Sequence, residues 1–189
     1  MDISWAALSS ADQQLFLVLN GIHHPVTDFL FKWITYKYTW VPLYLFLIVA
    51  ISRAYKREAF AIIILSILAL ILADYITSGI MKPYFARFRP CHDPFIGDIV
   101  HNITGCGGQF GFASSHASTS FALTSAFYFF TRDRIPWIKW LFVWAAIYAY
   151  SRVAVGVHYP GDILVGALVG YITGTVFVFV YRYFRKSLL

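Results

Sequence analysis

Five residues with side chains suited to phosphate chemistry stand at the edges of apolar stretches in this chain. They are Lys82, Arg89, His116, Arg152 and His158. Cations gathered at such an edge repel one another unless an anion joins them. A phosphate carries up to two charges and several acceptor oxygens, and arginine can bind it bidentately. For a single cation, contact with lipid head groups or snorkelling is the simpler explanation. Three cations with two histidines favour a phosphate site.

The spacing of His158 and Asp162 predicts an activated histidine. If a helix has begun by His158, the two residues share one helical face. Pro160 is compatible with this because proline is tolerated in the first turn of a helix. The carboxylate of Asp162 then bonds one ring nitrogen, fixes the tautomer and leaves the other nitrogen free to attack. We therefore predict His158 as the nucleophile and Asp162 as the residue that orients it.

The segment around His116 supplies the remaining candidate groups. His116 begins an apolar stretch and is placed to protonate a leaving oxygen as a general acid. Ser114 and the backbone near Ser115 precede the expected helix, whose N-terminal N–H groups bind anions well. Either histidine alone would be read as an interfacial residue without a role. The three cations can replace the electrostatic work of a metal, and the motifs lack the paired carboxylates of a magnesium site. We predict hydrolysis without metal or cofactor.

The composition indicates a membrane protein. Hydrophobic residues make up 59% of the 189 residues and charged residues 13%, with a mean hydropathy of +0.65. Soluble domains carry roughly 25% charged residues. The net charge is +6, but the basic residues cluster between apolar runs and at the C-terminus. That placement favours anionic lipid over nucleic acid as the partner. Asp2 and the pair Gln13–Gln14 argue against a cleavable signal peptide.

Five apolar stretches predict an all-α, polytopic bundle that forms one domain over residues 1–189. The expected spans are Tyr38–Ile51, Ala59–Met81, Ser118–Phe130, Ile135–Tyr150 and Asp162–Tyr181. A helix needs about 20 residues to cross the hydrocarbon, so the shorter stretches require flanking residues.

Basic residues between these stretches predict the orientation of the bundle. Three clusters fall on one side of a five-span model: Arg53, Lys56 and Arg57; Arg132, Arg134 and Lys139; Arg182, Arg185 and Lys186. The positive-inside rule places that side in the cytoplasm. The loop 82–115 and the turn 151–158 then lie outside it. We expect a bacterial inner-membrane protein whose active site faces the periplasm or the outside.

The N-terminal segment, residues 1–37, is ambiguous because polar residues interrupt its apolar pattern. We expect an interfacial helix from Ser10 to Asn20, with Ser10 as its N-cap, Gln13 closing a capping box and Gly21 ending it. A sixth span is the alternative.

Asp74 lies inside the second expected span, where an ionisable group is costly. A structural hydrogen bond to a neighbouring span and tuning of the site are both open explanations for it.

The only two cysteines, Cys91 and Cys106, fall in the same expected outside loop. A disulfide can persist there, and we expect one. Two unpaired thiols are the alternative. A zinc site made of Cys91, His92, His101 and Cys106 is less favoured, because the spacing is not that of a zinc finger.

Three motifs in order resemble the type 2 phosphatidic acid phosphatase superfamily. They read Lys82-x6-Arg89-Pro90, Ser114-x-His116 and Ser151-Arg152-x5-His158-x3-Asp162. The resemblance implies that Lys82, Arg89 and Arg152 bind the phosphate with help from Ser114 and Ser115. It implies the roles already inferred for the two histidines and for the aspartate. Ser115 departs from the family pattern, which has glycine there, and adds a side chain where the backbone is expected to approach the phosphate.

The resemblance implies a lipid phosphatase that acts on a lipid phosphomonoester or pyrophosphate through a phosphohistidine. Undecaprenyl diphosphate is the first expected substrate and lipid A the second. Phosphatidylglycerophosphate and phosphatidate follow. A vanadate-dependent haloperoxidase and a non-catalytic binder or transporter of lipid phosphates are weaker alternatives. Neither the lipid nor the oligomeric state is indicated by the motifs.

Overall fold

The computed structural model describes residues 5–187, with side chains from Ser9 to Arg185. Within these residues the backbone is helical, apart from loops and one isolated β-bridge between Phe88 and Phe110. The α-helices are α1 (Trp5–Gly21), α2 (Pro25–Thr35), α3 (Val41–Tyr55), α4 (Ala59–Asp74), α5 (Lys82–Phe85), α6 (Ser115–Thr131), α7 (Leu141–Ala154) and α8 (Pro160–Ser187). The short 3-10 segments are η1 (Lys37–Trp40), η2 (Lys56–Glu58), η4 (Pro90–His92), η5 (Gly97–Ile99) and η6 (Pro136–Trp140), while η3 (Tyr75–Met81) is a π-helix.

Each expected apolar stretch corresponds to helix, so the prediction of an all-α bundle is confirmed. Two helical stretches among the described residues are long and apolar enough to cross a bilayer. They are Lys37–Phe85, with a mean hydropathy of 2.6, and Pro160–Arg185, with 2.3. The first of these contains both α3 and α4. Helices α6 and α7, with 17 and 14 residues, are shorter, so the expected count of five spans stays a prediction.

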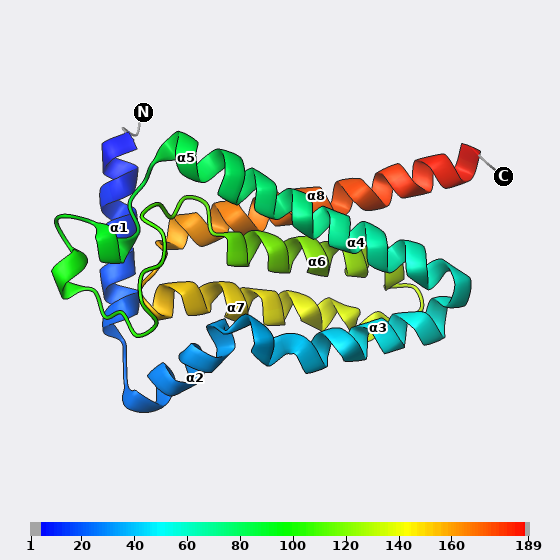
Figure 1. Cartoon of the computed structure of the whole chain (residues 1–189), viewed down its shortest axis with the longest axis horizontal. Coiled ribbons are helices and arrows are strands. Elements are labelled where there is room, and N and C mark those ends of the chain that lie inside the picture. Colours follow the sequence, from blue (N-terminus) through cyan, green and yellow to red (C-terminus); the bar gives the residue numbers. More distant parts are fainter. Residues whose placement is uncertain (1–4, 188–189) are drawn as a thin grey trace.

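The long helices lie side by side, and α1 stands across one end of the bundle (Figure 1). The loop 86–114 covers the same end, next to α1. The other end carries the α3–α4 and α6–α7 turns. There Arg134 Nη1 donates to the carbonyl of Ala54 at 2.8 Å, and Arg185 pairs with Glu58 at 2.8 Å. The three expected basic clusters therefore meet at one end, opposite α1.

Helix α6 is central and packs against α8, α4 and α7. Its contact with α8 is close because Gly166, Gly170 and Gly174 recur every fourth residue along α8. A side chain at Gly166 would meet the carbonyl oxygen of Ser114, and one at Gly170 would meet that of Ser118. Small residues at this spacing let two helix backbones approach closely. The glycine stripe thus fixes the start of α6 relative to the start of α8.

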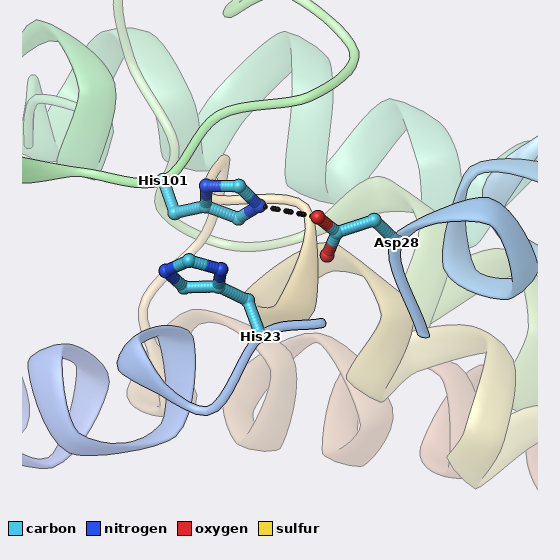
Figure 2. A group of neighbouring side chains, drawn as sticks. All are labelled: His23, Asp28 and His101. Atoms are coloured by element: carbon cyan, nitrogen blue, oxygen red, sulfur yellow. Dashed lines mark hydrogen bonds and ion pairs between the residues drawn. The ribbon is translucent and has the colours of Figure 1, made fainter. Parts of the chain in front are cut away.

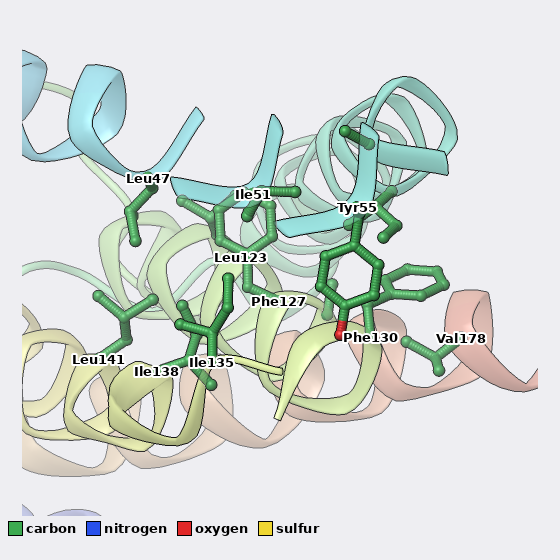
Figure 3. Packing of buried hydrophobic residues seen from close by; sticks show 13 residues of the cluster. Leu47, Ile51, Tyr55, Leu123, Phe127, Phe130, Ile135, Ile138, Leu141 and Val178 are labelled. Carbon is green, nitrogen blue, oxygen red and sulfur yellow. The ribbon is translucent and has the colours of Figure 1, made fainter. Parts of the chain in front are cut away.

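The largest buried apolar cluster lies toward the basic end of the bundle (Figure 3). Leu47, Ile51 and Tyr55 of α3 pack there against Phe127 and Phe130 of α6, together with residues of α4, η6, α7 and α8. A second, smaller cluster of Phe16, Val153 and Tyr159 joins α1 to the other end of the bundle. This second cluster lies directly beside the candidate site.

The N-terminal helix differs from the expectation at its start. Helix α1 begins at Trp5, so Ser10 lies inside the helix and is not its N-cap. Gln13 closes no capping box, because its amide donates to Asp93 Oδ2 at 2.9 Å. A polar residue that appears to begin a helix can instead serve a tertiary contact, which the local sequence does not show. The end at Gly21 is as predicted. Neither α1 nor α2 is among the candidate spans.

Candidate active site

His158 and Asp162 form a buried pair at the junction of α7 and α8. His158 Nδ1 lies 3.2 Å from Asp162 Oδ2, and the two side chains are 2% and 0% exposed. The N–H of Tyr159 also donates to Asp162 Oδ2, at 3.0 Å. The turn before His158 uses Gly156 at φ +81°, a conformation that favours glycine. Because the carboxylate faces Nδ1, the proton belongs on Nδ1, and Nε2 keeps its lone pair.

Arg87 holds the other oxygen of this carboxylate, a role not predicted from the sequence. Its Nη1 atom lies 3.0 Å from Asp162 Oδ1 and 2.8 Å from Asp12 Oδ2 of α1. The guanidinium stacks 4.1 Å from the ring centre of Tyr159. Asp12 Oδ1 in turn accepts from the N–H of Gly161 at 2.8 Å. Helix α1 therefore braces the first turn of α8 through one arginine and one backbone bond.

The three predicted phosphate-binding cations come from three different segments. Lys82 begins α5, Arg89 lies in the loop 86–114, and Arg152 is near the end of α7. Lys82 Nζ donates to Ser115 Oγ at 2.5 Å. Arg89 Nε donates to the carbonyl of Phe110 at 3.3 Å, and Arg152 Nη1 donates to Thr35 Oγ1 at 2.6 Å.

Within the part of the chain that the structure describes, none of these three cations forms an ion pair with a carboxylate. Among the described residues, the buried Nε of Arg152 has no hydrogen-bond partner. A buried arginine donor without an acceptor is costly, and an anionic ligand would satisfy it.

The electrostatics of the site keep His158 neutral. Burial lowers the pKa of His158 well below its usual value, and the positive charges of Arg89, Arg152 and Lys82 lower it further. All three cations are thus close enough to act on this one ring. Burial also lowers the pKa of Arg89, and the Asp162 carboxylate opposes that shift. A neutral imidazole is the form that attacks phosphorus.

The start of α6 brings Ser114, Ser115 and His116 to the same site. Ser114 is the N-cap residue of α6, and its buried Oγ has no hydrogen-bond partner among the described residues. The hydroxyl of Ser115, where the family pattern has glycine, binds Lys82. His116 lines a cavity of about 810 Å³ together with Arg89 and Arg152. One wall of this cavity is formed by Lys32, Trp33 and Thr35 of α2.

Asp74 is linked to the site through serine. Its Oδ1 atom accepts from Ser78 Oγ at 3.1 Å, and Ser78 Oγ lies 2.6 Å from Ser115 Oγ. Lys82 Nζ also donates to Ser78, at 3.2 Å. The π-helix η3 lies between Asp74 and Lys82 in the chain and carries Ser78. Of the two explanations for Asp74, this contact favours tuning of the site.

Cys91 and Cys106 are joined as a disulfide in the loop 86–114, with Cα atoms 5.9 Å apart. This excludes the four-residue zinc site considered from the sequence, because both thiols are used. His92 contacts the carbonyl of Gly107, and His101 contacts Asp28. Cys106 also lines the cavity beside Arg89, so the bridge holds one rim of the site.

Comparison with protein families identifies the arrangement. The model of the PAP2 superfamily matches residues 62–186, which include every predicted catalytic and phosphate-binding residue. The chain belongs to the PAP2 superfamily. The resemblance read from the three motifs is thereby confirmed, as is the prediction of a phosphatase.

Two of the similar proteins are lipid A 4'-phosphatases. The lipid A 4'-phosphatase of Porphyromonas gingivalis is 36% identical over 94% of this chain and 76% of its own length. The lipid A 4'-phosphatase of Bacteroides thetaiotaomicron is 34% identical over 92% of this chain and 78% of its own. The undecaprenyl-diphosphatase BcrC of Bacillus subtilis is 32% identical, but over only 44% of this chain and 42% of its own.

A solved PAP2 structure supports the fold. The crystal structure of LpxE from Aquifex aeolicus matches with a TM-score of 0.68 at 26% identity, covering 87% of this chain and 93% of that one. With the relatives, it shows that this chain is a lipid phosphatase of the PAP2 type. The relatives favour lipid A over undecaprenyl diphosphate, which reverses the order expected from the sequence.

Besides Arg87 and Asp12, the sequence reasoning missed Gly111. A Cβ atom at Gly111 would stand 3.1 Å from Asp162 Oδ2 and 3.4 Å from His158 Nδ1. The backbone of the loop 86–114 therefore closes over the histidine–aspartate pair. Two features of the sequence could have indicated these residues. Arg87 lies within the Lys82–Arg89 motif, and Gly111 lies three residues before Ser114.

Proposed function

We propose that this PAP2 enzyme hydrolyses a phosphate monoester of a lipid A-type glycolipid, with His158 as a covalent nucleophile. The observation that carries the mechanism is the buried His158–Asp162 pair facing three cations that lack carboxylate partners. The choice of lipid is supported by the two lipid A 4'-phosphatases, which align with more than nine tenths of the chain.

In the first step His158 Nε2 attacks phosphorus, and the bond from phosphorus to the lipid oxygen breaks. Burial and the neighbouring cations lower the pKa of His116 to about 2, so the bound phosphate dianion must hold the proton on His116 that passes to the leaving oxygen. Lys82, Arg89 and Arg152 bind the phosphoryl oxygens and stabilise the charge that develops on them. In the second step water attacks phosphorus and gives a proton to His116. The phosphorus–nitrogen bond breaks, which releases inorganic phosphate and restores His158.

The proposal places the site at the extracytoplasmic face of the inner membrane. The three basic clusters at the opposite end of the bundle support this orientation under the positive-inside rule. A second, largely apolar cavity of about 530 Å³ lies beside Arg87. It is bordered by Leu15 of α1, Phe85 of α5 and Val165 of α8. We assign an acyl chain of the substrate to it.

The test is phosphate release by the purified enzyme from lipid A, undecaprenyl diphosphate, phosphatidylglycerophosphate and phosphatidate, each in the same detergent. We expect lipid A to be hydrolysed with the highest kcat/KM. A preference for undecaprenyl diphosphate would overturn the proposed substrate and leave the mechanism intact. The His158→Ala variant is the control, and full activity in that variant would overturn the mechanism.

The hydrolysis is proposed to need no catalytic metal. Incubation with EDTA is expected to leave kcat unchanged in a short assay, because the three cations supply the electrostatic stabilisation. Loss of activity that Mg²⁺ restores would contradict this.

A further inference from the structure

Three side chains of the metal-binding types meet outside the active site (Figure 2). They are His23 in the turn after α1, Asp28 in the first turn of α2 and His101 in the loop 86–114. Their ligand atoms all lie within 4.8 Å of one another. His101 Nε2 is 2.8 Å from Asp28 Oδ2, and the rings of His23 and His101 stack with centroids 3.8 Å apart.

The backbone that carries His101 is held in place. Asn20, which is buried, donates to the carbonyl of His101 at 3.0 Å and accepts from its N–H at 2.9 Å. The same amide donates to the carbonyl of Ala154 at the end of α7. Gly156 lies so close to His101 that any side chain there would collide with the His101 carbonyl. The backbone position of His101 is therefore set by the fold and not by its half-buried imidazole.

Asp28 and His23 differ in how they are held. Asp28 is fixed in the first turn of α2, where its N–H donates to the carbonyl of His24 at 2.9 Å. His24 is committed to that helix, because its Nδ1 accepts from the N–H of Val26 and closes a capping box. His23 is exposed, and no described residue hydrogen-bonds its ring nitrogens. One ligand is thus free to turn while two are positioned.

We propose that His23, Asp28 and His101 bind a divalent transition-metal ion, with Zn²⁺ the best match. Two imidazoles, one carboxylate and a water complete the tetrahedral N/O set that Zn²⁺ takes. Tetrahedral bonds of about 2.0–2.1 Å place ligand atoms roughly 3.4 Å apart. Binding therefore requires the exposed His23 ring to leave its stack on His101 and turn one nitrogen toward the other two ligands. Mg²⁺ and Ca²⁺ prefer all-oxygen sites.

The ion would be structural, not catalytic. It takes the lone pair of His101 Nε2, whose hydrogen then lies on Nδ1, and it bonds Asp28 Oδ2 in place of the present hydrogen bond. It ties the α1–α2 turn to the loop 86–114. Helix α2 forms one wall of the active-site cavity through Lys32 and Trp33. Zinc binding therefore fixes that wall without touching His158.

The experiment measures Zn²⁺ binding to the full chain, purified in detergent with a tag that contains no histidine. Calorimetry should give one Zn²⁺ per chain, and the midpoint of thermal unfolding should rise with free Zn²⁺ because the ion binds the folded state. Co²⁺ in place of Zn²⁺ should give the visible absorption of a tetrahedral N/O site. Mg²⁺ should neither bind stoichiometrically nor raise the midpoint of thermal unfolding.

Single variants assign the ligands. His23→Ala, Asp28→Asn and His101→Gln should each weaken Zn²⁺ binding by about tenfold or more. His23→Ala is the most informative variant, since the removal of an exposed side chain should leave folding intact. His24→Asn is the matched control, because asparagine keeps the N-cap acceptor while removing the neighbouring imidazole. It should bind Zn²⁺ as the native chain does.

His158→Ala should also retain Zn²⁺ binding, which separates this site from the active site and makes the result independent of the proposed function. The proposal is overturned if the native chain binds no stoichiometric Zn²⁺. It is also overturned if His23→Ala binds as tightly as the native chain, or if binding depends on His158. In each of those cases the three residues form only a hydrogen-bonded contact.

Discussion

At one end of the bundle, Tyr55, Phe127 and Phe130 pack among other apolar side chains. At the other end, His158 and Asp162 are buried equally well, but among hydrogen bonds and ion pairs. The apolar end is held by non-directional contacts that tolerate a change of shape if the volume is kept. The polar end depends on direction, because a displacement of about 1 Å can cost 10²-fold in rate. Equal burial therefore serves stability at one end and geometry at the other.

The largest expected effect is at the polar end. Replacing the nucleophile in His158→Gln should lower kcat by at least about 10⁴-fold, since no other group forms the covalent intermediate. Quenched reactions with radiolabelled substrate should show phosphoenzyme in the native chain and none in the variant. The unfolding midpoint should remain close to that of the native chain. If the variant still formed phosphohistidine, a residue other than His158 would be the nucleophile.

The apolar end should respond in the opposite way. Phe127→Ala leaves a cavity and should reduce the free energy of unfolding by about 3 kcal/mol, while kcat per folded molecule changes less than about twofold. Phe127→Leu is the milder comparison and should cost less. Denaturant unfolding and active-site titration on the same sample measure both quantities. A large fall in kcat with unchanged stability in Phe127→Ala would contradict the proposed difference between the two ends.

Arg87 tests whether the polar end depends on positioning. Arg87→Lys loses the planar guanidinium that lies over Tyr159 and positions Nη1 between Asp162 and Asp12, so kcat should fall by about 10²-fold while KM changes little. Asp12→Asn keeps Arg87 on Asp162 and should cost about tenfold less. Steady-state kinetics with lipid A measures both. Equal losses in the two variants would mean that Asp12, and not Asp162, is the important partner of Arg87.

The smallest effect is expected at Asp74. Asp74→Asn retains an acceptor for Ser78 but removes a negative charge near Lys82, so kcat should fall by only a few-fold. Ser78→Ala breaks the same chain of bonds and is the matched variant. If both variants were expressed normally and had unchanged kcat, the role of Asp74 would be purely structural.

The helical segments and the main site residues could be predicted from the sequence, for a physical reason. Apolar runs of helical length are local features. His158 and Asp162 are only four residues apart, although α8 begins at Pro160, so that His158 lies in the turn before the helix. Lys82, Arg89 and Arg152 were identified because cations are unusual beside apolar stretches on that side. Each of these signals can be read within a window of about ten residues.

The contacts that hold the site are not local. Asp12 reaches Arg87 and Gly161 across 75 and 149 positions of sequence, and no periodic pattern marks such a pair. Ser10 resembled an N-cap because capping preferences are local, whereas the described helix already includes Ser10 in its interior. The substrate could not be read from the motifs, because residues of phosphate-binding types carry no information about the lipid.

The close packing of α6 on α8 has an evolutionary consequence. The glycine stripe fixes the reaction groups on those two helices, whereas the cavity wall on α2 joins the bundle through a separate set of contacts. Natural variation in α2, apart from Thr35, which binds Arg152, can therefore change which head group is accepted while the hydrolytic step is inherited intact. A family built in this way can diversify its substrates by altering one short helix. A chimaera that exchanges residues 25–34 between two relatives, and so keeps Thr35, should carry the donor's lipid preference with it.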